Sequence, residues 1–301
     1  MSGFKAMLRR NIKLFFKDKG MFFTSLITPL ILLVLYSTFL SKVYKDSFLM
    51  SLPEGFTVTE RIINGAVGGQ LFASLLAVCC VTVAFCSNML MVNDKVTGAT
   101  KDIGMTPLKK STLAMSYYVS TFASTFIICT VATVACFIYL GVVGWYLSVA
   151  DIFAIVLDVF LLVMFGTALS SIINFFLSTQ GQISAVGTVV SAGYGFICGA
   201  YMPISQFSEG LQKAISFLPG TYGTSLLRNH TMRGAFDAMI DDGVPVEFID
   251  GMKDAVDCNL YFFDNKVPVG VMYAVLAISA IVLVGIYVAI NCTLGKRIKK
   301  R

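Results

Sequence analysis

The stretch MVNDKVTGATKDIGMTPLKKS, residues 91–111, lies between two long apolar stretches of the chain. Residues 62–93 and 111–150 contain no Asp, Glu, Lys, Arg or His. Uncharged runs of this length are typical of membrane-spanning helices, so the chain must turn around in water between them. The connecting stretch has two acidic residues and more basic ones, which favours the cytoplasmic side of the membrane. Its charged residues are Asp94, Lys95, Lys101, Asp102, Lys109 and Lys110.

Two interpretations of this connection are open. Gly98 and Gly104 loosen the backbone, and Pro107 ends any helix that begins near Asp94. One interpretation is an ordinary loop that follows the positive-inside rule. The other is a short helix that lies along the membrane surface and is bound by a cytoplasmic partner.

The composition predicts a polytopic membrane protein without a sizeable soluble domain. Of the 301 residues, 56% are hydrophobic and 13% are charged, whereas soluble domains are roughly 25% charged. The net charge of +6 does not indicate nucleic-acid binding, because basic residues cluster at the two ends of the chain. Six of them lie within residues 1–19 and five within residues 296–301. Basic flanks of this kind place both termini in the cytoplasm and require an even number of spans.

We therefore expect an all-α polytopic membrane protein with six transmembrane helices in the cell (plasma) membrane. The domain 21–292 would contain spans at about 21–40, 62–92, 113–145, 152–177, 183–202 and 267–292. Residues 203–266 would form an external segment, and residues 293–301 a basic cytoplasmic tail. The external assignment rests on charge, because residues 222–266 contain eight acidic and four basic residues.

Residues 1–20 have the pattern of an amphipathic helix. We expect this helix to lie in the interface of the membrane, with its apolar side toward the lipid and its basic side near lipid phosphates. A plain positive-inside flank is the alternative interpretation. The apolar residues at helical spacing are Phe4, Met7, Leu8, Ile12 and Phe15.

A second short helix is predicted before the last span. Its apolar residues are expected on one helical face, and Pro219 and Gly220 are expected to end it. The helix is either re-entrant, dipping into the outer leaflet, or a plain external amphipathic helix. The apolar residues are Phe207, Leu211, Ile215 and Leu218.

Few residues are candidates for chemistry. An acidic residue within a span is a functional candidate by default, but Asp158 lies only about two turns from the start of its span. We therefore expect it to reach the outer headgroups and to contribute little to activity. We predict no catalytic residues, because the chain has one histidine, His230, in a polar segment. The chain also lacks a Gly-x-x-x-x-Gly-Lys-Ser/Thr phosphate loop and a Cys/His pattern typical of metal sites.

The 91–111 stretch resembles the first cytoplasmic loop of ABC-2-type export permeases. In that family the loop commonly runs acidic-basic-acidic-x-Gly-Thr and ends with a small residue and Pro. Here it runs Asp94-Lys95-Val96-Thr97-Gly98-Ala99 and ends Met105-Thr106-Pro107-Leu108. Val96 replaces the second acid and Ala99 the Thr. The resemblance extends over nearly the whole chain through the spacing of the spans, the basic N-terminal helix and the helix before the last span.

The resemblance implies the membrane subunit of an ATP-driven exporter, which is not itself an enzyme. A separate ABC ATPase would bind ATP and Mg and would dock on a coupling interface in this loop. A second permease subunit, identical or related, would complete a path for a hydrophobic or amphipathic substrate. A secondary transporter, or an immunity or scaffold protein, is the alternative. The coupling interface would comprise Asp94, Lys95, Val96, Gly98, Lys101, Asp102, Ile103, Met105 and Pro107.

Overall fold

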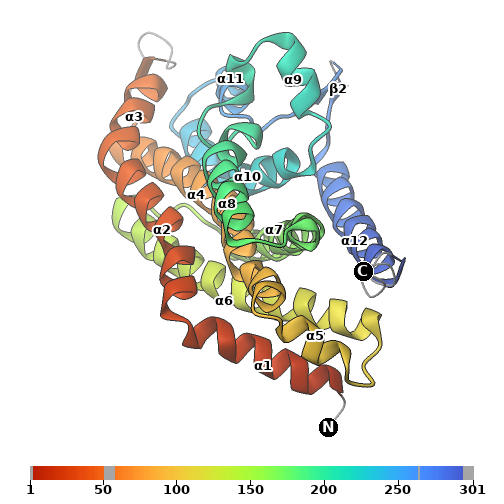
Figure 1. Cartoon of the computed structure of the whole chain (residues 1–301). Coiled ribbons are helices and arrows are strands. Elements are labelled where there is room, and N and C mark those ends of the chain that lie inside the picture. Colours follow the sequence, from red (N-terminus) through yellow and green to blue (C-terminus); the bar gives the residue numbers. More distant parts are fainter. Residues whose placement is uncertain (1–2, 51–57, 264, 294–301) are drawn as a thin grey trace.

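The computed structural model describes residues 3–50, 58–263 and 265–293 of the protein. Figure 1 shows a bundle of long helices, with shorter elements gathered at its two ends. The basic tail expected at residues 293–301 lies outside the described residues from position 294 onward.

Within residues 3–50 and 58–143, the structure describes six α-helices and one π-helical turn. Helix α1 is separated from α2 by Asp18 alone, and this residue caps α2 by accepting a hydrogen bond from the Met21 amide at 3.1 Å. The elements are α1 (Gly3–Lys17), α2 (Lys19–Leu35), the π-helical turn η1 (Tyr36–Leu40), α3 (Ser41–Met50), α4 (Glu60–Val96), α5 (Ala99–Gly104) and α6 (Lys110–Val143).

The second half of the chain is also helical, apart from one small hairpin of two strands that pair antiparallel. The elements are α7 (Val149–Phe176), α8 (Gln180–Ile197), the 3-10 turn η2 (Ile204–Gln206), α9 (Glu209–Ile215), α10 (Pro219–Asp241), α11 (Val246–Ala255), β1 (Tyr261–Phe262), β2 (Asn265–Lys266) and α12 (Val269–Thr293).

Five helical segments among the described residues are long and apolar enough to cross a membrane: Lys19–Asp46, Glu60–Val96, Lys110–Val143, Val149–Phe176 and Val269–Thr293. They correspond to five of the six predicted spans. The remaining predicted span, 183–202, corresponds to α8, which is more polar and ends at Ile197. An all-α polytopic fold is thus confirmed, while the sixth span stays a prediction.

Helix α4 forms the centre of the bundle. Its 37 residues extend over roughly 55 Å at 1.5 Å per residue, which exceeds the thickness of a bilayer core. The helix contacts α2, α6, α7, α8 and α10, and most of its side chains are buried. A helix that is apolar on every side, as this one is, must be covered on every side.

Glycines at the start of α4 allow neighbouring helices to approach its backbone. A Cβ atom placed on Gly69 would lie 2.7 Å from the carbonyl oxygen of Thr231 in α10. One placed on Gly65 would lie 3.1 Å from the carbonyl oxygen of Gly144, after α6. Small residues are the usual means by which membrane helices pack closely.

The structure corrects the expected organisation of residues 203–266. Phe207, Leu211, Ile215 and Leu218 do not form one helical face, because α9 ends at Ile215 and α10 begins at Pro219. Of these four residues, Ile215 alone is buried. Pro219 starts a helix instead of ending one, since its fixed φ suits the first helical position.

Helix α10 is the largest departure from the expectation of an open polar segment. It has 23 residues and packs against α4, α7 and α12. Its apolar and small residues recur on the sides that face these helices, so even its polar residues Arg228 and His230 are buried.

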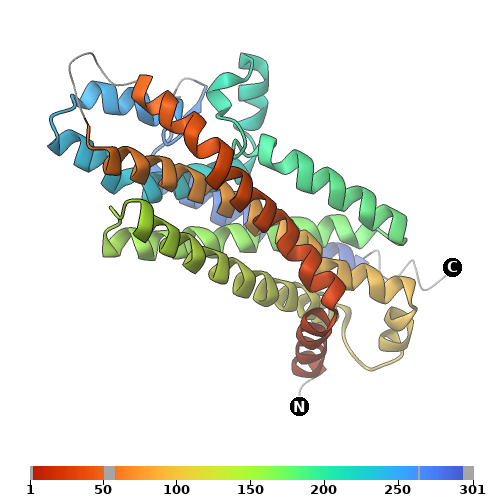
Figure 2. The ribbon, with the colours of Figure 1, turned by 90° about the vertical axis from the view of Figure 1, so that its left-hand side faces the viewer.

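The molecule has two distinct ends. Figures 1 and 2 show α1 and α5 at one end, and α3, α9, α11 and the β-hairpin at the other. We call these the α5 end and the α9 end.

We predict that Gly69→Ala lowers the stability of the fold, because the added methyl group meets backbone of α10 that cannot rotate away. Overpacking of this kind costs about 1–3 kcal/mol. The measurement is the midpoint of thermal unfolding of the purified protein in detergent.

Gly141→Ala is the control, since a Cβ atom at Gly141 of α6 has nothing within 4 Å. This change should leave the midpoint unaltered or raise it slightly, because Ala favours a helix over Gly. Equal midpoints for the two variants would contradict the close contact between α4 and α10.

Candidate functional site

The connection between α4 and α6 forms a compact structure at the α5 end. Helix α4 ends at Val96, and the chain turns at Gly98, whose φ of +83° lies in the left-handed region. Glycine adopts this conformation without the cost that a Cβ atom brings. The turn leads directly into α5, after which Pro107 precedes the start of α6 at Lys110. The predicted short helix is therefore present, displaced toward the Gly98–Pro107 half of the stretch.

Asp94 anchors this connection to two other helices. The Arg10 guanidinium of α1 donates two hydrogen bonds to the Asp94 carboxylate, at 2.7 and 2.8 Å. The Tyr117 hydroxyl of α6 donates a third at 2.5 Å. Asp94 is buried, and the bond to its carboxylate raises the pKa of Arg10 against the opposing effect of partial burial. Bidentate pairs of this kind are strong and fix geometry.

Lys95 anchors the connection to a third helix. Its ammonium donates to the carbonyl oxygens of Asn174, Phe175 and Leu177, at 3.0, 2.5 and 3.0 Å. These carbonyls belong to the last turn of α7 and its C-cap, where helical carbonyls lack partners and attract cations. The ammonium also lies 5.3 Å from the centre of the Phe175 ring. All three N–H donors of Lys95 are thereby used.

The residues that follow these two anchors face outward. Val96 is 44% exposed and Met105 is 83% exposed. Ile103 and Gly98 are partly buried. The surface therefore combines apolar and charged groups, as surfaces that bind other proteins commonly do. The other outward-facing members of the predicted interface are Lys101, Asp102 and Pro107.

The structure thus divides the predicted interface into two groups. Asp94 and Lys95 bind within the bundle, and the other seven residues lie on or next to the exposed surface. We use the name α5 surface for the five exposed residues of the second group together with the partly buried Ile103. Its members are Val96, Lys101, Asp102, Ile103, Met105 and Pro107. This division could not be predicted from the sequence, because charged residues are normally expected to lie in solvent.

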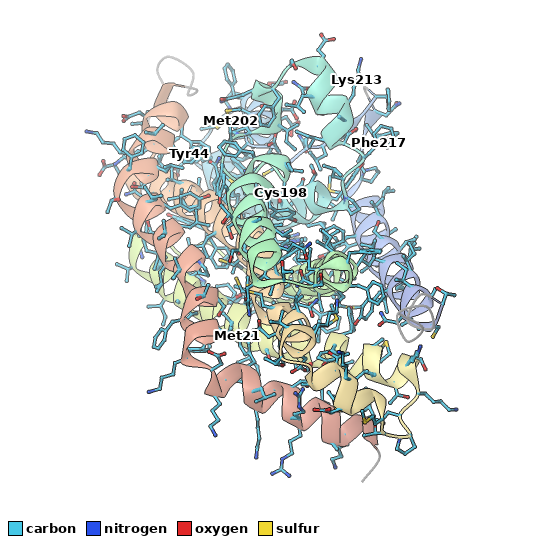
Figure 3. The ribbon with its side chains drawn as sticks, in the orientation of Figure 1. Met21, Tyr44, Cys198, Met202, Lys213 and Phe217 are labelled. Carbon is cyan, nitrogen blue, oxygen red and sulfur yellow. The ribbon has the colours of Figure 1, made fainter. Side chains whose placement is uncertain are left out.

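Helix α1 presents its apolar side to the protein and its basic side outward, where Figure 3 shows side chains that end in nitrogen projecting away from the bundle. Met7 and Phe15 are buried, while Phe4, Leu8 and Ile12 are partly buried. The helix packs against α6, and Gly3 lies against the Leu108 side chain. Helices α6 and α2 thus cover much of the apolar side of α1 that was expected to face lipid.

Helix α10 carries buried polar side chains that pair with acidic residues of neighbouring segments. His230 Nδ1 lies 2.7 Å from Asp158 Oδ2 of α7, and the His230 ring stacks on Tyr273 of α12 at 6.0 Å between centres. Asp158 is fully buried, so the expectation that it reaches the headgroups is wrong. The reason is that α10 covers this side of α7 and supplies a partner.

The second contact is between Arg228 of α10 and Asp257. Arg228 Nη1 donates to Asp257 at 3.0 Å, and Nη2 donates to the carbonyl oxygen of Gly199 at 2.6 Å. The Ile204 amide also donates to Asp257 at 2.7 Å. Burial raises the pKa of Asp257, and Arg228 opposes this effect. Neither contact was expected from the sequence, because residues 222–266 were predicted to be an external polar segment. A signal for a packed helix is nevertheless present, because apolar residues recur there with a helical period: Leu226, Leu227, Met232, Ala235, Phe236 and Met239.

The family model described as ABC-2 type transporter matches residues 2–231 of the chain. The match covers α1, the α5 surface and most of α10. A search among curated proteins finds no matching relative.

We predict that Asp158→Ala and His230→Ala each destabilise the protein, because either change leaves a buried polar partner unsatisfied. Leaving such a buried polar group without its partner costs about 1–3 kcal/mol, and more where the group is charged. The double variant should lose less stability than the sum of the losses in the two single variants. A double-mutant cycle based on thermal unfolding measures this difference.

The control is Asp237→Ala, because Asp237 lies on the exposed side of α10. Changes at such positions usually stay within about 0.5 kcal/mol. Strictly additive losses for Asp158 and His230 would contradict their direct interaction.

Proposed function

The chain belongs to the ABC-2 type transporter family, and we propose that it is the membrane subunit of an ATP-driven exporter powered by a separate ATPase. Members of this family are membrane transport components and not themselves catalytic. Membership argues against the alternative interpretations of a secondary transporter, an immunity protein or a scaffold.

The observation that carries the proposal is the combination of the α5 surface with its two internal anchors. The surface offers exposed apolar and charged groups to a partner. Directly behind it, Asp94 binds α1 and α6, and Lys95 binds α7. A force applied to α5 would therefore reach three helices through short, charge-assisted hydrogen bonds. A long flexible loop in the same place would absorb the displacement.

The proposed partner supplies the ATP chemistry. ATP and Mg would be bound by the ATPase, because this chain has no Gly-x-x-x-x-Gly-Lys-Ser/Thr loop. Closure of the ATPases on ATP would push the α5 surface and α1. The resulting tilt of the helices would alternate the path between inward-open and outward-open states.

A second permease subunit, identical or related, would complete the path. Helix α8 supports this part of the proposal, because small residues make up much of its exposed side, next to the exposed Val189, Phe196 and Ile197. Small residues on a membrane helix usually mark contact with another helix. The exposed small residues of α8 are Gly181, Ser184, Ala185, Thr188 and Ala192. A hydrophobic or amphipathic substrate would suit a path bounded by the apolar spans of the two subunits.

The proposed orientation places the α5 end in the cytoplasm of a cell whose plasma membrane holds the bundle. Basic residues support it, since Lys5, Arg9, Lys13 and Lys17 are exposed on α1 at that end. Exposed apolar side chains on α2 and α12, such as Phe23, Ile27 and Ile281, would contact membrane lipids. Both termini would then be cytoplasmic.

We predict that replacing Val96, Ile103 and Met105 together with Asp abolishes binding of the ATPase. Three new carboxylates would place charge where the partner buries apolar area, while the folded bundle loses little because these side chains are exposed or partly exposed. The test is copurification of the partner ATPase, together with transport in inside-out vesicles.

The control carries Val246→Asp and Phe248→Asp on α11. These apolar side chains are 54% and 45% exposed, but they lie at the α9 end. The control should bind the ATPase and transport normally. The proposal fails if the triple variant binds its ATPase as the unaltered chain does.

We also predict that Lys95→Met leaves the ATPase bound but uncouples it. The methionine keeps the length of the side chain and removes the three hydrogen bonds to α7. We expect substrate-stimulated hydrolysis to fall about tenfold, which corresponds to roughly 1.4 kcal/mol in the activation barrier.

Lys109→Met is the matched control, because Lys109 is an exposed lysine of the same connection and lies outside the α5 surface. It should retain coupling, since single exposed ion pairs contribute only about 0–1 kcal/mol. Full coupling in Lys95→Met would show that the link to α7 does not transmit the movement.

A further inference from the structure

A cavity of about 640 Å³ lies at the α9 end, far from the α5 surface. Its size falls within the range of sites for drug-sized molecules. Its walls come from η2, α9, the first turns of α10, the end of α11 and the β-hairpin. In Figure 3, Lys213 and Phe217 mark this region, at the opposite end of the bundle from Met21. The lining includes Ser205, Glu209, Lys213, Tyr222, Asp254 and Phe263.

Much of the polar lining is already engaged in the fold. The Gln212 amide donates to the carbonyl oxygens of Phe207 and Ser205, at 2.7 and 3.2 Å. The Tyr222 hydroxyl donates to the Ser216 carbonyl at 2.7 Å. Asp257 is committed to Arg228 and to the Ile204 amide. These groups shape the wall and have little capacity left for a ligand.

Asp254 is the lining carboxylate that is both held in place and free to bind. Its Oδ1 accepts hydrogen bonds from Asn259 at 2.7 Å and from the Tyr261 hydroxyl at 3.1 Å, which fix the orientation of the group. Among the described residues, no hydrogen bond or ion pair to its Oδ2 occurs. The carboxylate is partly buried at the end of α11 and lines the cavity.

The local charge favours a cation. Glu209 and Lys213 lie one turn apart on α9, so their charges largely cancel across the cavity wall. Arg228 and Asp257 cancel as a buried pair. The charge of Asp254 therefore remains as the net charge of the described lining.

A cluster of aromatic rings adjoins the cavity through Phe263. Phe217, Phe262 and Phe263 form a cluster with ring centres 4.9 to 6.0 Å apart, and each ring is at least 36% exposed. Phe263 and Tyr261 also line the cavity. A carboxylate next to exposed aromatic faces is the chemistry that recognises organic ammonium and phosphonium ions, through ionic and cation–π attraction.

We propose that this cavity binds an amphipathic organic cation, with its charge against Asp254 and its apolar body against the aromatic cluster. The site is distinct from the ATPase-binding function proposed above and does not depend on it. Its position at the α9 end leaves it accessible whether or not an ATPase is bound.

The test uses tetraphenylphosphonium as the probe and the full chain in nanodiscs, with empty nanodiscs to subtract uptake by lipid. Equilibrium dialysis should show that Asp254→Asn weakens binding about tenfold, because the ionic attraction is lost while the hydrogen-bonding shape remains. Asp250→Asn is the matched control, since Asp250 lies one turn earlier on α11 and is exposed. It should bind the probe as the unaltered chain does.

Two further measurements make the result independent of the folding of one variant. Lys213→Gln should strengthen binding about two- to fivefold, because it removes an opposing surface charge. Tetraphenylborate, which has the same four rings and the opposite charge, should bind much more weakly than tetraphenylphosphonium. The proposal is overturned if the borate binds as tightly as the phosphonium, or if Asp254→Asn and Asp250→Asn bind the phosphonium alike.

Discussion

The structure depends on the complete covering of α4 by other helices. A helix that is apolar on every side gains from burial on every side, and α4 is surrounded by α2, α6, α7, α8 and α10. Close approach is made possible by Gly65 and Gly69 on α4, and by Gly166 on α7, where a Cβ atom would lie 2.9 Å from the carbonyl oxygen of Cys80. Because α4 also leads directly into the α5 surface, the centre of the bundle and its exposed end are one continuous helix.

Polar contacts occur where this central packing meets the two ends. At the α5 end, Asp94 and Lys95 tie the last turn of α4 to α1, α6 and α7. Toward the α9 end, Arg228 and His230 tie α10 to Asp257 and Asp158. A buried polar or charged group is costly unless it is paired, so each contact favours the helix positions in which its partners meet. Such contacts suit a transporter, whose helices must move between a few defined arrangements.

The two ends differ in what they offer to other molecules. The α5 surface is exposed and is anchored from behind by Asp94 and Lys95, which suits the proposed ATPase partner. The α9 end encloses a cavity whose walls come from η2, α9, the β-hairpin, the end of α11 and the first turns of α10, which suits a small molecule. Both regions place charged groups next to apolar ones. On the α5 surface these groups are exposed along a short helix, whereas in the cavity they lie around Asp254.

The sequence by itself determined the class of protein and the position of five membrane-spanning helices, because hydropathy over about 20 residues decides whether a segment enters a bilayer. It also identified the connection between the second and third spans, with the two glycines and the proline that interrupt it, because glycine and proline act through the local backbone. The tertiary structure alone decided that α10 is buried, that Asp158 has a partner, and that Asp94 and Lys95 face inward. In each case the partner lies far away in the sequence, as Arg10 does from Asp94 and His230 from Asp158. A charge is expected in solvent until a distant group is known to pair with it, and only the packing of the helices brings that group within hydrogen-bonding distance.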